Sequence, residues 1–156
     1  MCERSSTSQS TPPTVGEGYE PPQSAGASGI LKISVRQLHE IVCGSTTACF
    51  LLRGRTFSRA WVEGVLVNVD DGAAPSSFTL DDGTGTVPVS MPPEPLRSPV
   101  AVGDLVMVIG VPGISQEGGH SDRLAAHTIV LLNDQPQREA LWMLELCEFW
   151  HDAAAG

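Results

Sequence analysis

The chain has 156 residues, 41% of them hydrophobic, which is enough for one modest folded core plus a tail. Nine Lys and Arg residues stand against eighteen Asp and Glu residues, so the formal net charge is −9 at pH 7. A protein that holds a phosphate backbone mainly by electrostatics has the opposite balance, so the composition argues against strong nucleic-acid binding by the chain alone. The chain shows neither an apolar run of membrane-spanning length nor a signal-peptide layout, and we expect a soluble intracellular protein.

The first segment, residues 1–29, is rich in Ser, Thr, Pro and Gly and poor in large apolar side chains. Such a segment cannot bury enough apolar surface to offset the entropy of ordering. We therefore expect a disordered tail over residues 1–29 and a single folded domain over residues 30–152.

A short helix is predicted to begin after Ser34. Ser34 and Gln37 have the spacing of a capping box, and Gly44 supplies a stop signal. We expect this helix to plug one end of the domain. The next segment, residues 46–60, gives no clear pattern, but it holds the only local cluster of positive charge: Arg53, Arg55 and Arg59.

Five segments with strand character follow. A long strand opens at Trp61, with Gly64 at a point where a bulge would bend it, and a hairpin over residues 77–91 places Phe78 and Leu80 on the inward face. Two further strands, over residues 102–111 and 123–132, are largely apolar on both faces and need cover on two sides. This order predicts an all-β fold with flanking helices: a five-stranded Greek-key barrel of the OB type plus a C-terminal helix.

No catalytic, cofactor-binding or metal-binding constellation is found in the sequence. The carboxylates of Asp81 and Asp82 precede Gly83 where two strands turn, and Asp with Gly is favoured in such turns for its dihedral angles. The four cysteines and four histidines form no zinc-ligand spacing, and no Ser-His-Asp set has a supporting context. We therefore expect neither an enzyme nor a cofactor.

The most informative segment is the predicted C-terminal helix, at about residues 138–151. Its apolar side chains span an arc of about 220°, whereas a stripe that faces one core needs little more than 100°. Arg138, Glu145 and Glu148 mark one narrow polar side, which also holds Leu141. The apolar surplus predicts a protein partner, with these interface residues: Leu141, Trp142, Leu144, Leu146, Phe149 and Trp150.

Residues in three regions give the chain a resemblance to a known family. They are Trp61, Val62 and Gly64; the run Gly103–Val111; and Leu132, Asp134 and Pro136 followed by Glu139, Leu141, Trp142, Leu144 and Glu145. With these residues the chain resembles the RecQ-mediated genome instability protein 2 family over roughly residues 30–152, and the helix motif is the more specific part of the likeness.

The resemblance implies a non-catalytic nuclear subunit that pairs with an OB domain of RecQ-mediated genome instability protein 1. It implies that this pair supports topoisomerase III alpha and the Bloom helicase, which dissolve recombination intermediates without crossover. It also implies little or no direct affinity for DNA, in agreement with the acidic composition.

Two other functions stay open at this point. The first is a single-strand-binding OB subunit of the replication protein A or telomere-capping type, in which Arg53, Arg55 and Arg59 would be the nucleic-acid contacts. The second is an adaptor that recruits repair proteins through an outer groove of the barrel.

Overall fold

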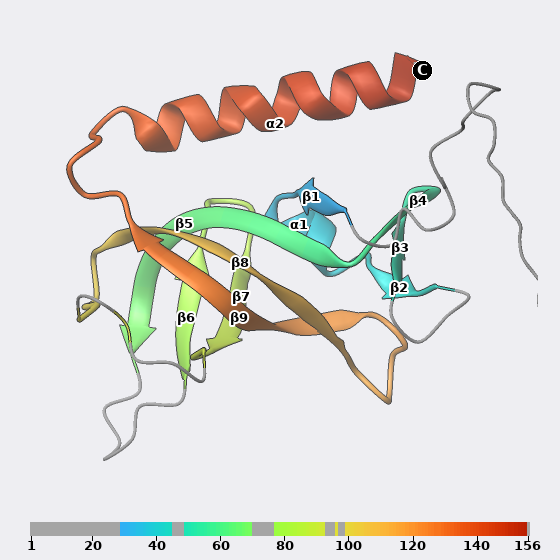
Figure 1. Cartoon of the computed structure of the whole chain (residues 1–156), viewed down its shortest axis with the longest axis horizontal. Helices are drawn as coiled ribbons and strands as arrows, with labels where there is room; N and C mark the ends of the chain where they lie inside the picture. Colours follow the sequence, from blue (N-terminus) through green and yellow to red (C-terminus); the bar gives the residue numbers. More distant parts are fainter. Residues whose placement is uncertain (1–28, 45–48, 70–76, 93–95, 97–98, 156) are drawn as a thin grey trace, which may run out of the picture.

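The computed structural model describes residues 29–44, 49–69, 77–92, 96 and 99–155. The predicted tail, residues 1–29, lies outside the described residues except for Gly29. In chain order the elements are β1 (Ile30–Lys32), α1 (Val35–Leu38), β2 (Val42–Cys43), β3 (Phe50–Leu52), β4 (Arg55–Phe57), β5 (Arg59–Val69), β6 (Ser77–Asp81), β7 (Thr86–Ser90), β8 (Leu105–Ile114), β9 (Ser121–Leu131) and α2 (Arg138–Ala155). Figure 1 shows a strand barrel with the long helix α2 along one side.

Five strands close the barrel. Strand β5 pairs with β6 and β6 with β7, both antiparallel; β7 runs parallel to β9, β9 antiparallel to β8, and β8 returns antiparallel to β5. Around the barrel the five strands therefore follow the order first, second, third, fifth, fourth. This is the Greek-key order of the OB fold, so the predicted fold class is confirmed.

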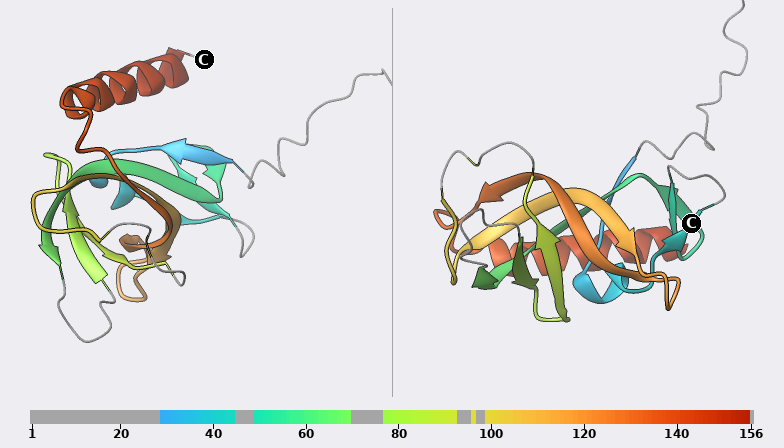
Figure 2. Two further views of the ribbon diagram at one scale, coloured as in Figure 1. Left: turned by 60° about the vertical axis from the view of Figure 1, so that its left-hand side comes forward. Right: turned by 90° about the horizontal axis from the view of Figure 1, so that it is seen from below.

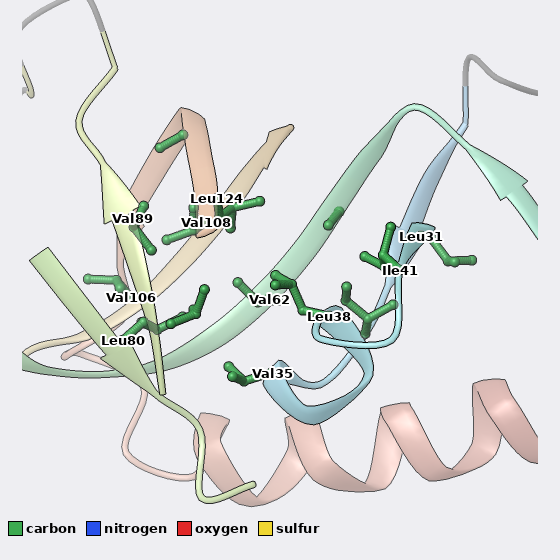
Figure 3. Close-up of a cluster of buried hydrophobic side chains, with 14 of the residues drawn as sticks. Leu31, Val35, Leu38, Ile41, Val62, Leu80, Val89, Val106, Val108 and Leu124 are labelled. Atoms are coloured by element: carbon green, nitrogen blue, oxygen red, sulfur yellow. The ribbon is translucent and has the colours of Figure 1, made fainter. Parts of the chain in front are cut away.

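Period-two alternation fills the interior. On β6 the residues Phe78 and Leu80 are buried, as predicted, and Val87 and Val89 of β7 are buried opposite them, whereas Ser90 is exposed. Side chains from the other strands point into the same space (Figure 3), among them Val62, Val106, Val108 and Leu124. Full burial of each such side chain stabilises the fold by roughly 1.5–3 kcal/mol.

Strand β5 bends where its partner changes, because its first half pairs with β8 and its second half with β6. A Cβ atom on Gly64 would lie 2.7 Å from the backbone oxygen of Asp81, so glycine is required for this close approach. The irregular register lies between Leu66 and Asn68. The expected bulge at Gly64 is therefore wrong, since the glycine serves close packing of two strands and the extra residue comes later.

Helix α1 closes one end of the barrel. Its predicted capping box is present: the Gln37 N–H donates to Ser34 Oγ at 3.1 Å, and the Ser34 N–H donates to Gln37 Oε1 at 2.9 Å. Val35 and Leu38 are buried and point into the barrel (Figure 3). The helix ends at Leu38, well before Gly44, because the chain after it pairs as strand β2 with β3.

The turn between β6 and β7 also holds α1 in place. Gly83 has a φ of 90°, as the predicted Asp-Gly turn requires. The carboxylate of Asp82 accepts the Thr84 N–H at 2.9 Å with one oxygen and the Val35 N–H at 2.8 Å with the other. A residue predicted to serve the turn alone therefore also caps the first turn of the barrel plug.

His39 links two strands at the same end of the barrel. Its Nδ1 atom lies 3.2 Å from the carbonyl oxygen of Ser121 on β9, and its Nε2 atom lies 3.1 Å from that of Thr86 on β7. The side chain thus bridges the start of two strands that pair only further along, at Val89 and Ser90.

The segment without a predicted element contributes a small second sheet, with the strand order β2-β3-β4. Strands β3 and β4 form a hairpin whose turn residues, Arg53 and Gly54, have φ values of 51° and 82°, as in a two-residue type I′ turn. The Arg53 guanidinium donates to both carboxylate oxygens of Glu40, at 2.9 and 3.0 Å. Figure 1 shows this hairpin below the C-terminal half of α2.

Candidate partner interface

Helix α2 packs on the outer surface of the barrel through one of its faces. Trp142 and Leu146 lie on that face and are only 1% and 5% exposed. The Trp142 ring stacks on that of Trp61 from β5, with a centroid distance of 5.9 Å and an interplanar angle of 25°. The expectation that Trp142 and Leu146 lie free for a partner is therefore wrong, because the chain's own barrel covers them.

A network of charges fixes the same face to the barrel. Arg138 donates to Glu63 of β5 at 2.9 Å and to Glu145, one to two turns along the helix, at 2.7 Å. Lys32 of β1 binds Glu145 at 3.3 Å, and the Trp61 indole N–H donates to Glu63 at 3.1 Å. The Glu63 side chain is only 3% exposed, and the ion pair with Arg138 offsets the cost of burying its charge.

The electrostatic consequences follow from the same contacts. The hydrogen bonds that Arg138 donates to Glu145 and Glu63 raise its pKa above the ordinary value. The hydrogen bond from Arg138, with a smaller contribution from Lys32, lowers the pKa of Glu145. Both groups are therefore held in their charged forms.

This network corrects the predicted orientation of the helix. Arg138 and Glu145, placed on the polar side in the sequence analysis, face the barrel rather than the solvent. The reason is that Glu63 lies on the outer face of β5 and needs a cation above it. The signal in the sequence was Glu63, the single carboxylate of β5, but its partner Arg138 lies 75 residues away in the chain.

The C-terminal part of α2 is held by the β3–β4 hairpin. The Trp150 indole N–H donates to the Lys32 carbonyl at 2.9 Å. The guanidinium carbon of Arg53 lies 5.7 Å from the Trp150 ring centroid, and that of Arg55 lies 5.1 Å from the Phe149 centroid. Phe149 and Trp150, predicted as interface residues, are thus half-buried against the chain's own arginines.

These contacts also bear on the predicted nucleic-acid contacts. Arg53 and Arg55 are exposed, but they are engaged with the α2 rings and, for Arg53, with Glu40. Arg59, the third member, is exposed at the start of β5. Arg53, Arg55 and Arg59 therefore do not form a single open groove in the described part of the chain.

The opposite face of α2 is open and mostly apolar, and it also carries the exposed Glu148 and His151. Leu141 is 43% exposed and Leu144 is 60% exposed, and Ala140 and Cys147 are exposed beside them. Ala140, Leu144 and Cys147 are spaced by four and three residues, so they lie in one row along the helix. We call Ala140, Leu141, Leu144 and Cys147 the outward face of α2.

Other kinds of site find little support in the described part of the chain. Trp61 lies beneath α2, and the other aromatic residues of the described strands, Phe50, Phe57 and Phe78, are buried, so none of them offers an open ring for a base. Among the described residues, no group of three or more His, Cys, Asp or Glu is placed to bind a metal ion. None of the described helices combines the length and apolarity needed to cross a bilayer.

Comparison with known families assigns the chain. The family model described as RecQ-mediated genome instability protein 2 matches residues 31–150. The chain belongs to this family. Comparison with curated proteins gives no significant match.

Solved structures with similar folds come from genome-maintenance complexes. A chain of a replication protein A heterotrimer bound to single-stranded DNA matches with a TM-score of 0.65 at 17% identity, over 80% of this chain and 98% of that chain. A chain of the S. pombe Stn1–Ten1 complex matches with a TM-score of 0.63 at 14% identity, over 78% and 90% of the two chains. Yeast replication protein A bound to single-stranded DNA gives 0.60 at 20% identity, over 78% and 89%. At these identities the likeness supports the OB fold and nothing finer.

The helix motif, the more specific part of the likeness to the RecQ-mediated genome instability protein 2 family, lies around the entry to α2. Leu132 is 7% exposed and donates its N–H to the Leu105 carbonyl at 2.8 Å. Asn133 accepts the Leu105 N–H at 2.8 Å and donates to Asp104 at 2.8 Å. The motif therefore ties the start of β8 to the turn before α2, while Trp142 and Glu145 dock the helix itself.

Proposed function

We propose that the chain is a non-catalytic OB subunit that forms a heterodimer with the OB-fold protein RecQ-mediated genome instability protein 1. In that complex it would act in the nucleus, stabilising the assembly of topoisomerase III alpha and the Bloom helicase that dissolves homologous-recombination intermediates. Its contribution would be to limit crossovers and maintain genome stability.

The outward face of α2 is the observation that carries this proposal. Leu141 and Leu144 are large apolar side chains that stay exposed although the other face of the helix is well packed. An apolar row on a formed helix is the surface that a second helix or an apolar groove covers. The proposed partner residues are therefore Leu141 and Leu144 from the sequence-based set, with Ala140 and Cys147 beside them.

Two further findings support a subunit role. Family membership places the chain with RecQ-mediated genome instability protein 2, and the similar solved structures are chains of a heterotrimer and of a two-protein complex. Glu63 and Glu145, the two carboxylates that pair with Arg138 between α2 and the barrel, serve to hold the helix in place.

The test is co-expression with RecQ-mediated genome instability protein 1, followed by size-exclusion chromatography with light scattering. We expect a 1:1 complex, and we expect Leu144→Glu to weaken it by more than about tenfold in the dissociation constant, because a charge would enter an apolar contact. Val67→Glu is the matched control, since Val67 is an exposed valine (44%) near the C-terminal end of β5. A wild-type protein that stays monomeric beside this partner would contradict the proposal.

Direct single-strand binding is the competing proposal, and its support is the fold shared with replication protein A structures that contain DNA. Fluorescence anisotropy with a labelled oligothymidine at low salt separates the two functions. Under the subunit proposal the chain alone binds weakly, and changing Arg59 to Gln alters little. Tight binding that disappears in an Arg53→Gln, Arg55→Gln, Arg59→Gln triple variant would favour the competing proposal.

A further inference from the structure

A second surface feature lies on the barrel itself. A groove of about 410 Å³ opens where strands β7, β8 and β9 meet. Strands β6 and β7 lie on the side of the barrel away from α2 (Figures 1 and 2), so the groove does not share the outward face of α2. We call it the β7–β9 groove and define it by these lining residues: Pro88, Ser90, Val111, Gly113, Arg123 and Ala125.

The groove exists because the strands that form it are poorly paired and carry small side chains. Strands β7 and β9 are in register only at Val89–Leu124 and Ser90–Ala125. The outward positions there are a serine on β7, an alanine on β9 and Gly113 on β8, so little side-chain volume covers the seam. The pyrrolidine ring of Pro88 and the Val111 side chain supply apolar walls.

Arg123 is the one charged residue among those that line the groove. A Cβ atom on Gly113 would lie 2.6 Å from the Arg123 Cγ and Nε atoms, so the absence of a side chain at Gly113 lets the arginine lie across β8. Arg123 Nη1 donates to Asp122 at 2.8 Å, and the side chain is still 57% exposed. The guanidinium therefore has donors left at the mouth of an apolar groove.

We propose that the β7–β9 groove binds an extended segment of a partner protein in which an aliphatic or proline side chain stands next to an acidic residue. The apolar side chain would occupy the space between Pro88 and Val111, and its neighbouring carboxylate would accept hydrogen bonds from Arg123. Charge complementarity selects this occupant, because the one charged side chain that lines the groove is a cation, Arg123, whose contact with Asp122 uses only its Nη1 atom.

Nucleic acid fits the same groove less well. No aromatic side chain lines it, and one guanidinium already shared with Asp122 cannot track a phosphate backbone. The proposal does not depend on the heterodimer, since the groove lies apart from α2 and would stay open while α2 is covered.

Selection from a phage library of random peptides of about 12 residues, with the full chain as bait, supplies the probe. We expect selected peptides to share an acidic residue beside Pro, Val or Leu. Binding of a labelled selected peptide, followed by fluorescence anisotropy, should weaken by about tenfold or more in Arg123→Glu and in Ser90→Tyr, which fills the groove without a charge. Arg36→Glu, at an exposed arginine on α1, makes the same charge change elsewhere and should bind as the wild type does.

Several outcomes would overturn the proposal. They are selected peptides without an acidic residue, binding that Ser90→Tyr leaves unchanged, or a selection that enriches nothing over the same selection on the Ser90→Tyr protein. Oligothymidine binding that is lost in Arg123→Glu would assign the groove to nucleic acid instead. Thermal melts that match the wild type establish that the variants are folded. These results can be interpreted even if the chain does not form the proposed heterodimer through α2, because the peptide assay uses the chain alone.

Discussion

Replacing Trp142 by Ala tests whether this residue stabilises the fold of the chain itself or contacts a partner protein. Its indole is 1% exposed and stacks on Trp61, so the substitution removes a large buried ring and leaves a cavity between α2 and β5. Trp-to-Ala changes in well-packed cores cost about 3–5 kcal/mol of folding free energy. For a chain of 156 residues this corresponds to a fall in Tm of roughly 6–20 °C.

The assay is a thermal melt of the isolated protein, followed by far-ultraviolet circular dichroism, with Trp142→Phe as the matched control. The Trp142 Nε1 atom is buried without a hydrogen-bond partner in the described part of the chain, so phenylalanine loses ring volume but no bond. We expect Trp142→Phe to lose clearly less than half of what Trp142→Ala loses. A Trp142→Ala protein that melts with the wild type, yet fails to bind the partner, would refute the packing argument.

Further predictions concern the charge network and the barrel plug. Arg138→Met leaves Glu63 buried without its cation and should cost about 3–5 kcal/mol in chemical denaturation, much of it recovered by adding Glu63→Leu. Because the folded-state pKa of Glu145 is lowered, its charge stabilises the fold above the unfolded-state pKa and stops doing so as pH falls through the folded-state value. The Tm advantage of wild type over Glu145→Gln should therefore be present at pH 7 and shrink below about pH 4. Asp82→Ala removes the acceptor of the Val35 N–H and should cost about 1–2 kcal/mol in urea unfolding, whereas no loss would show that α1 needs no cap from the turn.

The barrel could be predicted from the sequence because its signals are local. Alternation placed Phe78 and Leu80 inside, and the capping box at Ser34 marked the start of α1. The docking of α2 could not be predicted in the same way. Its covering surface includes Lys32, which is 118 residues from Trp150 in the chain.

The width of the apolar arc of α2 overestimated the surface left for a partner, and the reason is physical. A stripe of little more than 100° suffices when a helix meets one flat surface, but α2 also meets the β3–β4 hairpin, which came from a segment without a clear pattern. The guanidinium groups of Arg53 and Arg55 lie over the Phe149 and Trp150 rings, so the chain itself covers part of each ring. What remains of the surplus is narrower than predicted, and it includes Leu141 and Leu144.

The outward face of α2 is well suited to binding because the helix that carries it is already held in place. An isolated helix of 18 residues is marginal in water, so a partner that had to order it would lose affinity to that cost. Here Arg138 fixes the first turn to Glu63 and Trp150 fixes the far end to β1, so the row of exposed side chains is presented on a helix already formed. Under the proposed function, loosening this docking should weaken partner binding without changing any residue of the outward face of α2. Trp142→Ala and Leu144→Glu should both reduce complex formation, and only the first should lower the Tm of the isolated chain.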